Sequence, residues 1–505
     1  MKRCALPGIG LLAFVFLTAS GTGSGTTTPA PPAAHAGGID IVLTGDYPDP
    51  SIIRDGDYFY MTHTSHAYVP GLLIWRSKDL MNWERVGYAL KRFVGDVWAP
   101  DLVKHGDRFS IYFPAGGTNW VVTAPSPEGP WSDPVNLKVS GIDPGHIAAP
   151  DGKRYLYQDD GYVVELAPDG LSIAGKRAKV YDGWRYPDDW TVECFCLESP
   201  KLMFFKGMYY LTSAEGGTAG PGTSHMAVLA RSKNVLGPWE NCPTNPLVHT
   251  WSKTERYLSK GHGTLFRDAA GKWFIVYHAY ENGYPPLGRQ TIIEPVTPTK
   301  DGWFRTARDP QREGEVRKHR NVILEPDDFA GESLKLQWQF SGIGSLNEVE
   351  LADGALTIPC GTDGIRAMHA ILGDHNFEAT VKLEPEKGVE AGLILHYDQK
   401  IYAGIGLKDG YVFTMSKGEL TGNPMVEAPQ ARYFKVRLFE YDLTMFSSED
   451  GVNWKTYPSS LEVSGYQQNM LGGFSSLKIG VYGQGNGRLR IDDFTYRVLD
   501  DRFPE

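Results

Sequence analysis

A glycine-containing turn followed by an aromatic strand recurs five times in the first two thirds of this 505-residue chain, at intervals of 46 to 64 residues. Each copy follows a short apolar run, and several precede a third strand and a tryptophan. Repeats of about 40–60 residues, built from roughly four short strands each, are typical of propeller blades. We therefore predict an all-β protein that begins with a five-bladed β-propeller over residues 38–308. The turns are Gly56-Asp57, Gly106-Asp107, Gly152-Lys153, Gly207-Met208 and Gly271-Lys272.

A generic β-sandwich with coincidental glycine turns is the alternative fold for this region. It does not explain why Trp83, Trp131 and Trp239 occupy matching places in their repeats. Past residue 308 the pattern changes, because Asp309 to His319 is charged and lacks apolar periodicity. We interpret residues 309–325 as a linker. Alternating strands then predict a two-sheet jelly-roll β-sandwich over residues 326–505. Carbohydrate binding, support of the active-site rim and packing are all compatible roles for it, and packing support is favoured.

The N-terminus has the features of a targeting segment. Met1-Lys2-Arg3 is basic, and the apolar run centred on Leu11 to Thr18 is too short to remain as a membrane span. We predict that residues 1–36 are a signal peptide, cleaved after Ala36 or earlier near Ser20. The mature protein is then expected to be secreted or periplasmic, with no membrane segment, and its oligomeric state is left open.

The composition narrows the class of ligand. The net charge of −10 and a pI near 5.8 argue against nucleic acid or an anionic membrane as a partner. Aromatic residues make up 12% of the chain, and an aromatic surface without basic excess suits a neutral carbohydrate.

Three acidic residues stand at equivalent places in the repeats. Asp49 lies between Pro48 and Pro50, ahead of the first strand, and the two prolines stiffen the backbone there. Asp143 and Glu198 precede the third and fourth repeats. Because equivalent positions on successive blades converge on the propeller axis, all three carboxylates should point into one funnel. Two carboxyl groups flanking a sugar, tuned by a third charge, are what glycoside hydrolysis requires.

On these motifs the propeller region resembles glycoside hydrolase family 43, which contains β-xylosidases, α-L-arabinofuranosidases and arabinanases. The resemblance implies that Asp49 is the general base, that Glu198 is the general acid, and that Asp143 raises the pKa of the acid and orients it. It also implies inversion at the anomeric carbon, with the base and acid carboxyls about 6.5–9.5 Å apart. The motifs are Pro48-Asp49-Pro50-Ser51, Trp98-Ala99-Pro100-Asp101, Ile142-Asp143-Pro144, Glu198-Ser199-Pro200, Gly261-His262-Gly263 and Gly288-Arg289.

The same resemblance implies four substrate-binding residues. Arg289 matches the arginine of the −1 subsite, and Trp98 matches a wall of the sugar pocket, with a buried propeller tryptophan as the alternative. His262 matches an axial histidine beside which some arabinanases hold calcium through waters, with a core histidine bonded to the backbone as the alternative. A structural calcium there is left open although no cofactor is required. His66 stands where xylosidases of the family often have an aromatic residue. The long stretch Trp184 to Trp190 is expected to narrow the funnel and favour exo action.

Two functional classes follow from these observations. The first is a secreted, inverting, exo-acting hydrolase that removes terminal xylose or arabinofuranose from plant polysaccharide fragments. The second is a catalytically silent carbohydrate-binding propeller, which the presence of all three acids disfavours. For the cysteines of the mature chain, a bridge from Cys242 to Cys194 or Cys196 and free buried thiols are both compatible with the sequence. No Cys/His spacing resembles a zinc site.

Overall fold

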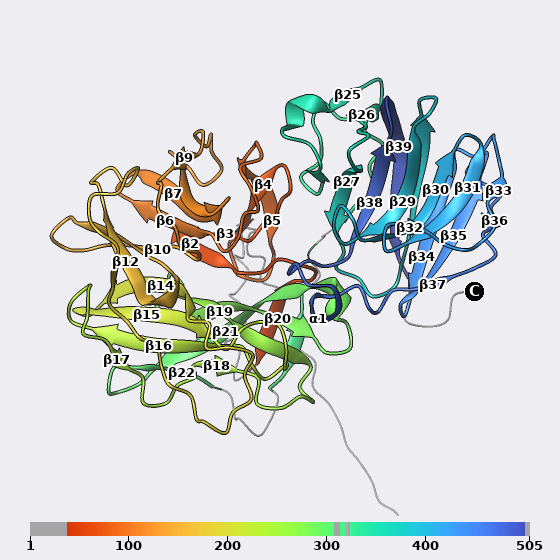
Figure 1. Ribbon diagram of the computed structural model, residues 1–505. Helices are drawn as coiled ribbons and strands as arrows, with labels where there is room; N and C mark the ends of the chain where they lie inside the picture. Colours follow the sequence, from red (N-terminus) through yellow and green to blue (C-terminus); the bar gives the residue numbers. More distant parts are fainter. Residues whose placement is uncertain (1–37, 308–313, 320, 322–323, 500–505) are drawn as a thin grey trace, which may run out of the picture. The chain divides into compact units, whose positions relative to one another are not determined.

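The computed structural model describes residues 38–307, 314–319, 321 and 324–499. The predicted signal peptide and part of the predicted linker lie outside the described residues. Nearly all regular structure is β, as predicted (Figure 1). Within the described ranges no helix is long and apolar enough to cross a membrane. The short helical segments are α1 (Gln468–Leu471), η1 (Asp159–Gly161), η2 (Pro285–Leu287) and η3 (Leu346–Glu348).

Five sheets form the blades of a β-propeller, which confirms the predicted architecture. The innermost strands β2, β6, β10, β14 and β19 each contact the next, so the ring of blades closes around a central axis. Blade 1 comprises β2 (Ser51–Asp55), β3 (Tyr58–Thr62), β4 (Gly71–Ser77) and β5 (Glu84–Leu90). Blade 2 comprises β6 (Asp101–His105), β7 (Arg108–Ala115), β8 (Thr118–Ala124) and β9 (Val135–Asn136). Blade 3 comprises β10 (Gly145–Ala148), β11 (Arg154–Tyr157), β12 (Tyr162–Leu166) and β13 (Ala178–Lys179). Blade 4 comprises β14 (Glu198–Phe205), β15 (Met208–Glu215), β16 (Met226–Ser232), β17 (Glu240–Asn241) and β18 (Val248–His249).

Blade 5 joins the two ends of the propeller sequence. The N-terminal strand pairs with β21 in antiparallel fashion, and it pairs in parallel with a strand from the predicted linker, at Val316 to Lys318. That part of the interval 309–325 is therefore a blade strand, because its backbone completes the edge of β1. The strands are β19 (Tyr257–Arg267), β20 (Trp273–Glu281), β21 (Arg289–Pro298), β22 (Phe304–Thr306), β1 (Ile39–Leu43) and β23 (Val316–Lys318).

The repeated glycines occupy the turn between the first and second strands of every blade. Their φ angles, from 56° to 85°, lie in the left-handed region that favours glycine. At Gly56 and Gly207 nothing lies within 4 Å of an added Cβ, so conformation, and not space, explains the residue type. The repeated tryptophans also match, because Trp83, Trp131 and Trp239 lie shortly before the fourth strand of their blades. Apolar side chains between neighbouring blades form the propeller core.

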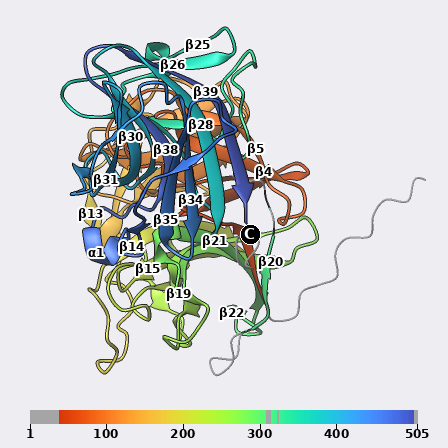
Figure 2. The same cartoon turned by 90° about the vertical axis from the view of Figure 1, so that its right-hand side faces the viewer.

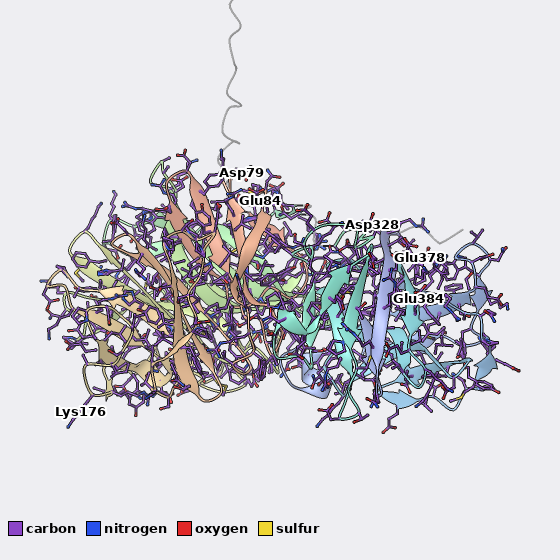
Figure 3. The ribbon with its side chains drawn as sticks, turned by 90° about the horizontal axis from the view of Figure 1, so that it is seen from above. Asp79, Glu84, Lys176, Asp328, Glu378 and Glu384 are labelled. Carbon is purple, nitrogen blue, oxygen red and sulfur yellow. A yellow bond between two sulfur atoms is a disulfide. The ribbon has the colours of Figure 1, made fainter. Side chains whose placement is uncertain are left out.

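Residues 324–499 contain two packed sheets, which confirms the predicted sandwich (Figure 2). Strand β28 alternates buried and half-buried side chains, as expected for a sheet with one face in the core. Charged side chains such as Glu84 and Lys176 project outward from the propeller (Figure 3). One sheet of the sandwich contains β24 (Gln339–Ser341), β27 (Arg366–Ile371), β38 (Lys478–Gln484), β29 (Glu390–His396), β30 (Tyr402–Lys408), β31 (Tyr411–Ser416), β32 (Glu419–Leu420) and β33 (Val426–Glu427). The other contains β25 (Glu350–Ala352), β26 (Ala355–Pro359), β39 (Arg488–Val498), β28 (Phe377–Pro385), β34 (Tyr433–Phe439), β35 (Asp442–Ser448), β36 (Lys455–Thr456) and β37 (Leu461–Glu462).

Candidate active site

The three predicted acids lie at the starts of innermost strands and line one pocket of about 150 Å³, here called the central pocket. Asp49 and Asp143 each stand two residues before their strand, and Glu198 is the first residue of β14. Trp98, His66, His262 and Arg289 also line this pocket, so the fold brings together every site residue that the sequence indicated. The blades thus place carboxylates from distant parts of the sequence around one axis.

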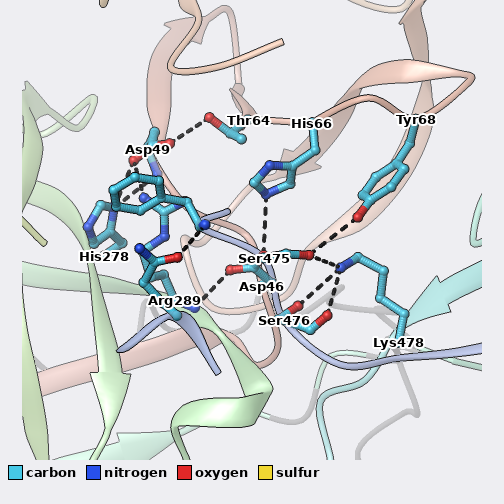
Figure 4. A network of polar contacts seen from close by, with 12 residues as sticks. Asp46, Asp49, Thr64, His66, Tyr68, His278, Arg289, Ser475, Ser476 and Lys478 are labelled. Carbon is cyan, nitrogen blue, oxygen red and sulfur yellow. Dashed lines mark hydrogen bonds and ion pairs between the residues drawn. The ribbon is translucent and has the colours of Figure 1, made fainter. Parts of the chain in front are cut away.

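Asp49 is a buried carboxylate held by cationic and polar neighbours (Figure 4). Its backbone φ is 58°, a conformation that aspartate tolerates better than most residues. Thr64 Oγ1 donates a hydrogen bond of 2.5 Å to Asp49 Oδ2, and Arg289 Nη1 donates one of 3.1 Å to Oδ1. Burial alone would raise the pKa of Asp49, but Arg289, His262 and His278 together hold it well below its usual range. Asp49 is therefore ionised at neutral pH.

Glu198 and Asp143 form a pair of carboxyl groups whose pKa values are raised, in contrast to the lowered pKa of Asp49. Burial, and then the negative charges of Asp143 and Asp49, raise the pKa of Glu198 well above its usual range. Burial and the Asp49 charge also raise the pKa of Asp143 to about 7, against the opposing effect of Lys201. The Ser199 backbone N–H donates to Asp143 Oδ2 at 3.1 Å, which stabilises that carboxylate. No described residue donates a hydrogen bond to the Glu198 carboxyl, so the shared proton belongs on Glu198.

His262 lies between these two groups of charges. Its Nδ1 is 3.3 Å from Asp49 Oδ1, and its Nε2 is 3.8 Å from Asp143 Oδ2. Burial lowers the pKa of His262 to about 3, so the ring is neutral. Sequence reasoning left a core histidine bonded to the backbone as an alternative, but this Nε2 has no hydrogen-bond partner among the described residues. The ring is buried beside the carboxylates, as expected for a residue that shapes the pocket floor.

The side chains around His262 include two groups of possible metal ligands. Two groups have ligand atoms within 4.8 Å of one another: Asp49, His262 and His278, and Glu198, His225 and His262. Each group offers one carboxylate and two imidazoles, whereas Ca²⁺ prefers six to eight oxygen ligands. These side chains supply few oxygen ligands, so a calcium ion beside His262 would take most of its oxygen ligands from water.

Asp46 was missed by the sequence analysis, although it stands three residues before Asp49. The Arg289 backbone N–H donates to Asp46 Oδ1 at 2.9 Å, and His66 Nε2 lies 3.4 Å from Asp46 Oδ2 (Figure 4). His66 and Arg289 together with the weaker influence of Lys478 outweigh burial and lower the pKa of Asp46 to about 2. Asp46 therefore positions both of the predicted substrate-binding residues that flank it.

A buried ion pair between Lys201 and Asp101 links blades that carry residues of the central pocket. Lys201 Nζ lies 3.0 Å from Asp101 Oδ1 and also donates to the Pro144 carbonyl at 3.3 Å, next to Asp143. The other Asp101 oxygen accepts the His146 backbone N–H at 2.7 Å. These contacts join blades 2, 3 and 4. Asp101 belongs to a motif quoted above, but its structural role depends on contacts that sequence spacing does not reveal.

Two exposed aromatic side chains form walls of the central pocket. Trp98 is 41% exposed, which excludes the alternative of a buried propeller tryptophan. Phe474 is also 41% exposed and comes from the sandwich, in the loop between α1 and β38. Its ring centre lies 5.9 Å from the Arg289 guanidinium carbon. The sequence carries no local signal for Phe474, because it lies in the second domain and in no repeat.

The cysteine pairing differs from both alternatives considered above. Cys194 and Cys196 form a disulfide with each other, while Cys242 is buried and free. The Cα atoms of Cys194 and Cys196 are 5.3 Å apart, within the range that a disulfide can span. Both bridged cysteines line the central pocket, together with Glu193.

Of the long stretch that precedes Glu198, only the residues nearest to Glu198 line the central pocket. Trp190 stacks on His249 with ring centres 4.6 Å apart and contacts Trp251, and it does not line the central pocket. None of the residues from Trp184 to Trp190 lines the central pocket, so the structure gives this stretch no part in the pocket wall. Glu193, Cys194 and Cys196 line the pocket instead, and Glu193 and Cys194 lie beside Gly217.

Comparisons with known proteins agree with this geometry. The family model described as glycosyl hydrolases family 43 matches residues 40–304, and the model described as beta xylosidase C-terminal concanavalin A-like domain matches residues 326–497. A non-reducing end alpha-L-arabinofuranosidase of Bacteroides ovatus is 28% identical, covering 91% of this chain and 94% of its own length. A beta-xylosidase of Bacillus subtilis is 30% identical over 52% of this chain and 55% of its own. The crystal structure of the GH43 BlXynB protein from Bacillus licheniformis has a TM-score of 0.79 at 26% identity, covering 91% of this chain and 99% of its own.

Proposed function

Because the chain belongs to glycosyl hydrolase family 43 and is an O-glycoside hydrolase, we propose that it is a secreted, inverting exo-enzyme for terminal pentoses. The substrates would be plant cell-wall polysaccharides or oligosaccharides ending in xylose or arabinofuranose. One observation carries this proposal: a single pocket holds Asp49, whose cationic neighbours lower its pKa, and Glu198, whose burial and negative neighbours raise its pKa. A general base and a general acid need pKa values shifted in these two directions.

The proposed mechanism uses these two carboxyls on opposite faces of the sugar. Asp49 accepts a proton from a water molecule as the water attacks the anomeric carbon. Glu198 donates its proton to the glycosidic oxygen, so the leaving sugar departs as a neutral alcohol. Asp143 keeps the proton on Glu198, and Arg289 holds Asp49 in place while presenting further donors to the bound sugar.

The size of the central pocket supports exo action. Its volume of about 150 Å³ is below the roughly 300–1,000 Å³ of pockets for drug-sized ligands. Phe474 and the Cys194–Cys196 bridge contribute to its walls. Such a pocket suits one terminal sugar ring better than an internal stretch of a polysaccharide.

The preference for a pentose rests on the relatives. Their printed names include both a beta-xylosidase and an alpha-L-arabinofuranosidase. Hydrolysis of matched aryl β-xyloside and aryl α-L-arabinofuranoside, with aryl glucoside as a control, tests this preference. Cleavage of the glucoside at a similar kcat/KM would contradict it.

Product stereochemistry tests the inverting mechanism directly. The first product formed should have the anomeric configuration opposite to that of the substrate, because water attacks from the Asp49 side. Proton NMR, read before mutarotation, distinguishes the two anomers. A retained anomer, or a methyl glycoside formed in added methanol, would show that one carboxyl acts as a nucleophile and would overturn the assigned roles.

Asp143→Asn should move the alkaline limb of the pH profile to lower pH. Removing the negative charge lowers the pKa of Glu198, so the acid loses its proton at a lower pH. A shift of about one pH unit or more is expected in kcat/KM for an aryl glycoside. Asp151→Asn, in an exposed turn of the same blade, serves as the control and should leave the limb unmoved. An unchanged limb in Asp143→Asn would contradict the assigned role.

A further inference from the structure

Glu215 carries a buried carboxyl group that the mechanism above does not use. It is the last residue of β15, in blade 4 (Figure 1). The Trp184 backbone N–H donates a hydrogen bond of 2.6 Å to Glu215 Oε1, whereas Oε2 has no hydrogen-bond partner among the described residues. Burial raises the pKa of Glu215 to about 8, against the opposing effects of the Trp184 N–H and the Arg185 charge. Glu215 does not line the central pocket, so any influence on the reaction has to pass through other residues.

Glu215 and its neighbour contact both ends of residues 183–196, here called the wall loop. At the first end, a Cβ on Gly183 would lie 2.7 Å from Glu215 Oε1 and 2.5 Å from Phe195 Cζ, so Gly183 lies against both groups. At the second end, the Gly216 N–H donates to the Phe195 carbonyl at 3.1 Å. The end of β15 therefore holds the beginning and the end of the wall loop together.

The second end of the wall loop belongs to the central pocket. Phe195 stands between Cys194 and Cys196, whose disulfide bridge lines the pocket. Gly217, two residues after Glu215, also lines the pocket, and a Cβ there would lie 3.0 Å from Cys194 Sγ. Because closely packed interiors transmit small displacements, a shift of Phe195 would move the bridged cysteines in the pocket wall.

We propose that Glu215 is a positioning residue, whose carboxyl group holds the wall loop so that the Cys194–Cys196 bridge lies close to the terminal sugar. For its consequence in catalysis this inference rests on the proposed function. The wall is on the page neither as an acid nor as a base, and it meets the sugar equally in the ground state and in the transition state. Loss of the Glu215 contact should therefore weaken substrate binding and leave the chemical step unchanged.

The protonation of Glu215 makes the hold on the wall loop depend on pH. While buried, the carboxyl keeps its proton up to about pH 8, whereas its ordinary pKa is 4.5. Release of the loop is therefore linked to proton loss, so the free energy that holds the loop falls as the pH rises from 4.5 to about 8 and is constant above that. The titratable side chains that act on Glu215 or respond to its charge are Arg185, Tyr181 and Tyr186. None of these three changes its charge in this range, since arginine stays cationic and the pKa values of both tyrosines are raised.

Two substitutions of Glu215 test the inference by steady-state kinetics on aryl β-xyloside or aryl α-L-arabinofuranoside, whichever is cleaved. Glu215→Leu removes the acceptor of the Trp184 N–H, so KM at pH 5 should rise roughly three- to tenfold, as for one lost buried hydrogen bond, while kcat stays within about twofold. Glu215→Gln keeps an acceptor oxygen and should have the wild-type KM at pH 5. The control, Glu240→Gln in the exposed β17 of the same blade, should change neither constant. An unchanged KM in Glu215→Leu, or a fall in kcat as large as the rise in KM, would overturn the inference.

The pH dependence of KM is a second readout, and it does not require Glu215→Leu to fold. The ratio of the wild-type KM to the KM of Glu215→Gln should rise roughly threefold or more between pH 5 and pH 8, because the amide cannot ionise. The titrations of Glu198 and Asp143 are common to both proteins and cancel in this ratio. A constant ratio would contradict the role given to the Glu215 carboxyl.

Hydrogen exchange separates failure of this inference from failure of the proposed function, because it needs no turnover. In the full-length Glu215→Leu protein, peptides from residues 183–196 should exchange their amide hydrogens roughly tenfold faster than in the wild type at the same pH. Peptides from β7, in another blade, should exchange as in the wild type. If aryl pentosides are not cleaved but the wall loop exchanges faster, the proposed reaction fails and the positioning role stands. Unchanged exchange in the wall loop would show that Glu215 does not hold it.

Discussion

Asp49→Asn should lower kcat by roughly 10²–10⁴-fold on every substrate, the usual contribution of a general base. The amide cannot accept the proton of the attacking water, although it keeps the size of the side chain and can still accept the Thr64 hydrogen bond. The loss should be equal for aryl glycosides and oligosaccharides, because both need the same water. Steady-state kinetics with both substrate types provide the measurement.

Asp55→Asn is the matched control for this substitution. Asp55 is the last residue of β2, the strand that Asp49 precedes; it is half-exposed and pairs with Lys104 at 2.6 Å. It should keep wild-type kcat, and both variants should retain the β-rich circular dichroism spectrum of the native protein. An Asp49→Asn variant that keeps more than about a third of wild-type kcat would exclude Asp49 as the base.

Glu198→Ala should lower kcat/KM by roughly 10²–10⁴-fold for oligosaccharides, whose alkoxide leaving groups need a proton. Aryl glycosides with acidic phenols should lose far less, since these leaving groups depart without protonation. The alkaline limb of the pH profile should also disappear for the activated substrate, because the group with the raised pKa is gone. A series of aryl glycosides of graded leaving-group pKa measures this dependence.

The control for Glu198→Ala lies on the same blade. Glu240 is exposed in β17 and pairs with Arg231 at 2.9 Å, so Glu240→Ala should leave the leaving-group dependence unchanged. Equal losses on activated and unactivated substrates in Glu198→Ala would show that Glu198 does not supply the proton. The acid would then have to be sought among the other carboxyl groups of the central pocket.

The blade architecture was predictable because its determinants are local. A left-handed turn favours glycine wherever it occurs, and five such turns at similar intervals indicate five hairpins without any knowledge of their packing. The alternation in β28 is likewise a local consequence of one buried face. The interval around Val316 was misread because β23 is a short edge strand whose partner, β1, lies near the other end of the propeller sequence.

The acids of the site were also identifiable, but their protonation states were not. Asp49, Asp143 and Glu198 stand at equivalent places in their repeats, and propeller symmetry is enough to bring such places together. Which of them holds a proton depends on distances to charges from other blades. Arg289 comes from blade 5 and stabilises the charge of Asp49, whereas Glu198 faces mainly negative neighbours.

The sequence by itself determined the repeat, the fold class and the residue types at the pocket floor. Only the tertiary structure decided the walls, which include the Cys194–Cys196 bridge and Phe474 from the second domain. The physical reason is that secondary structure follows from local conformational preference, which a repeat displays openly. The walls depend on side-chain contacts that no repeat displays, and one of them, Phe474, comes from a different domain.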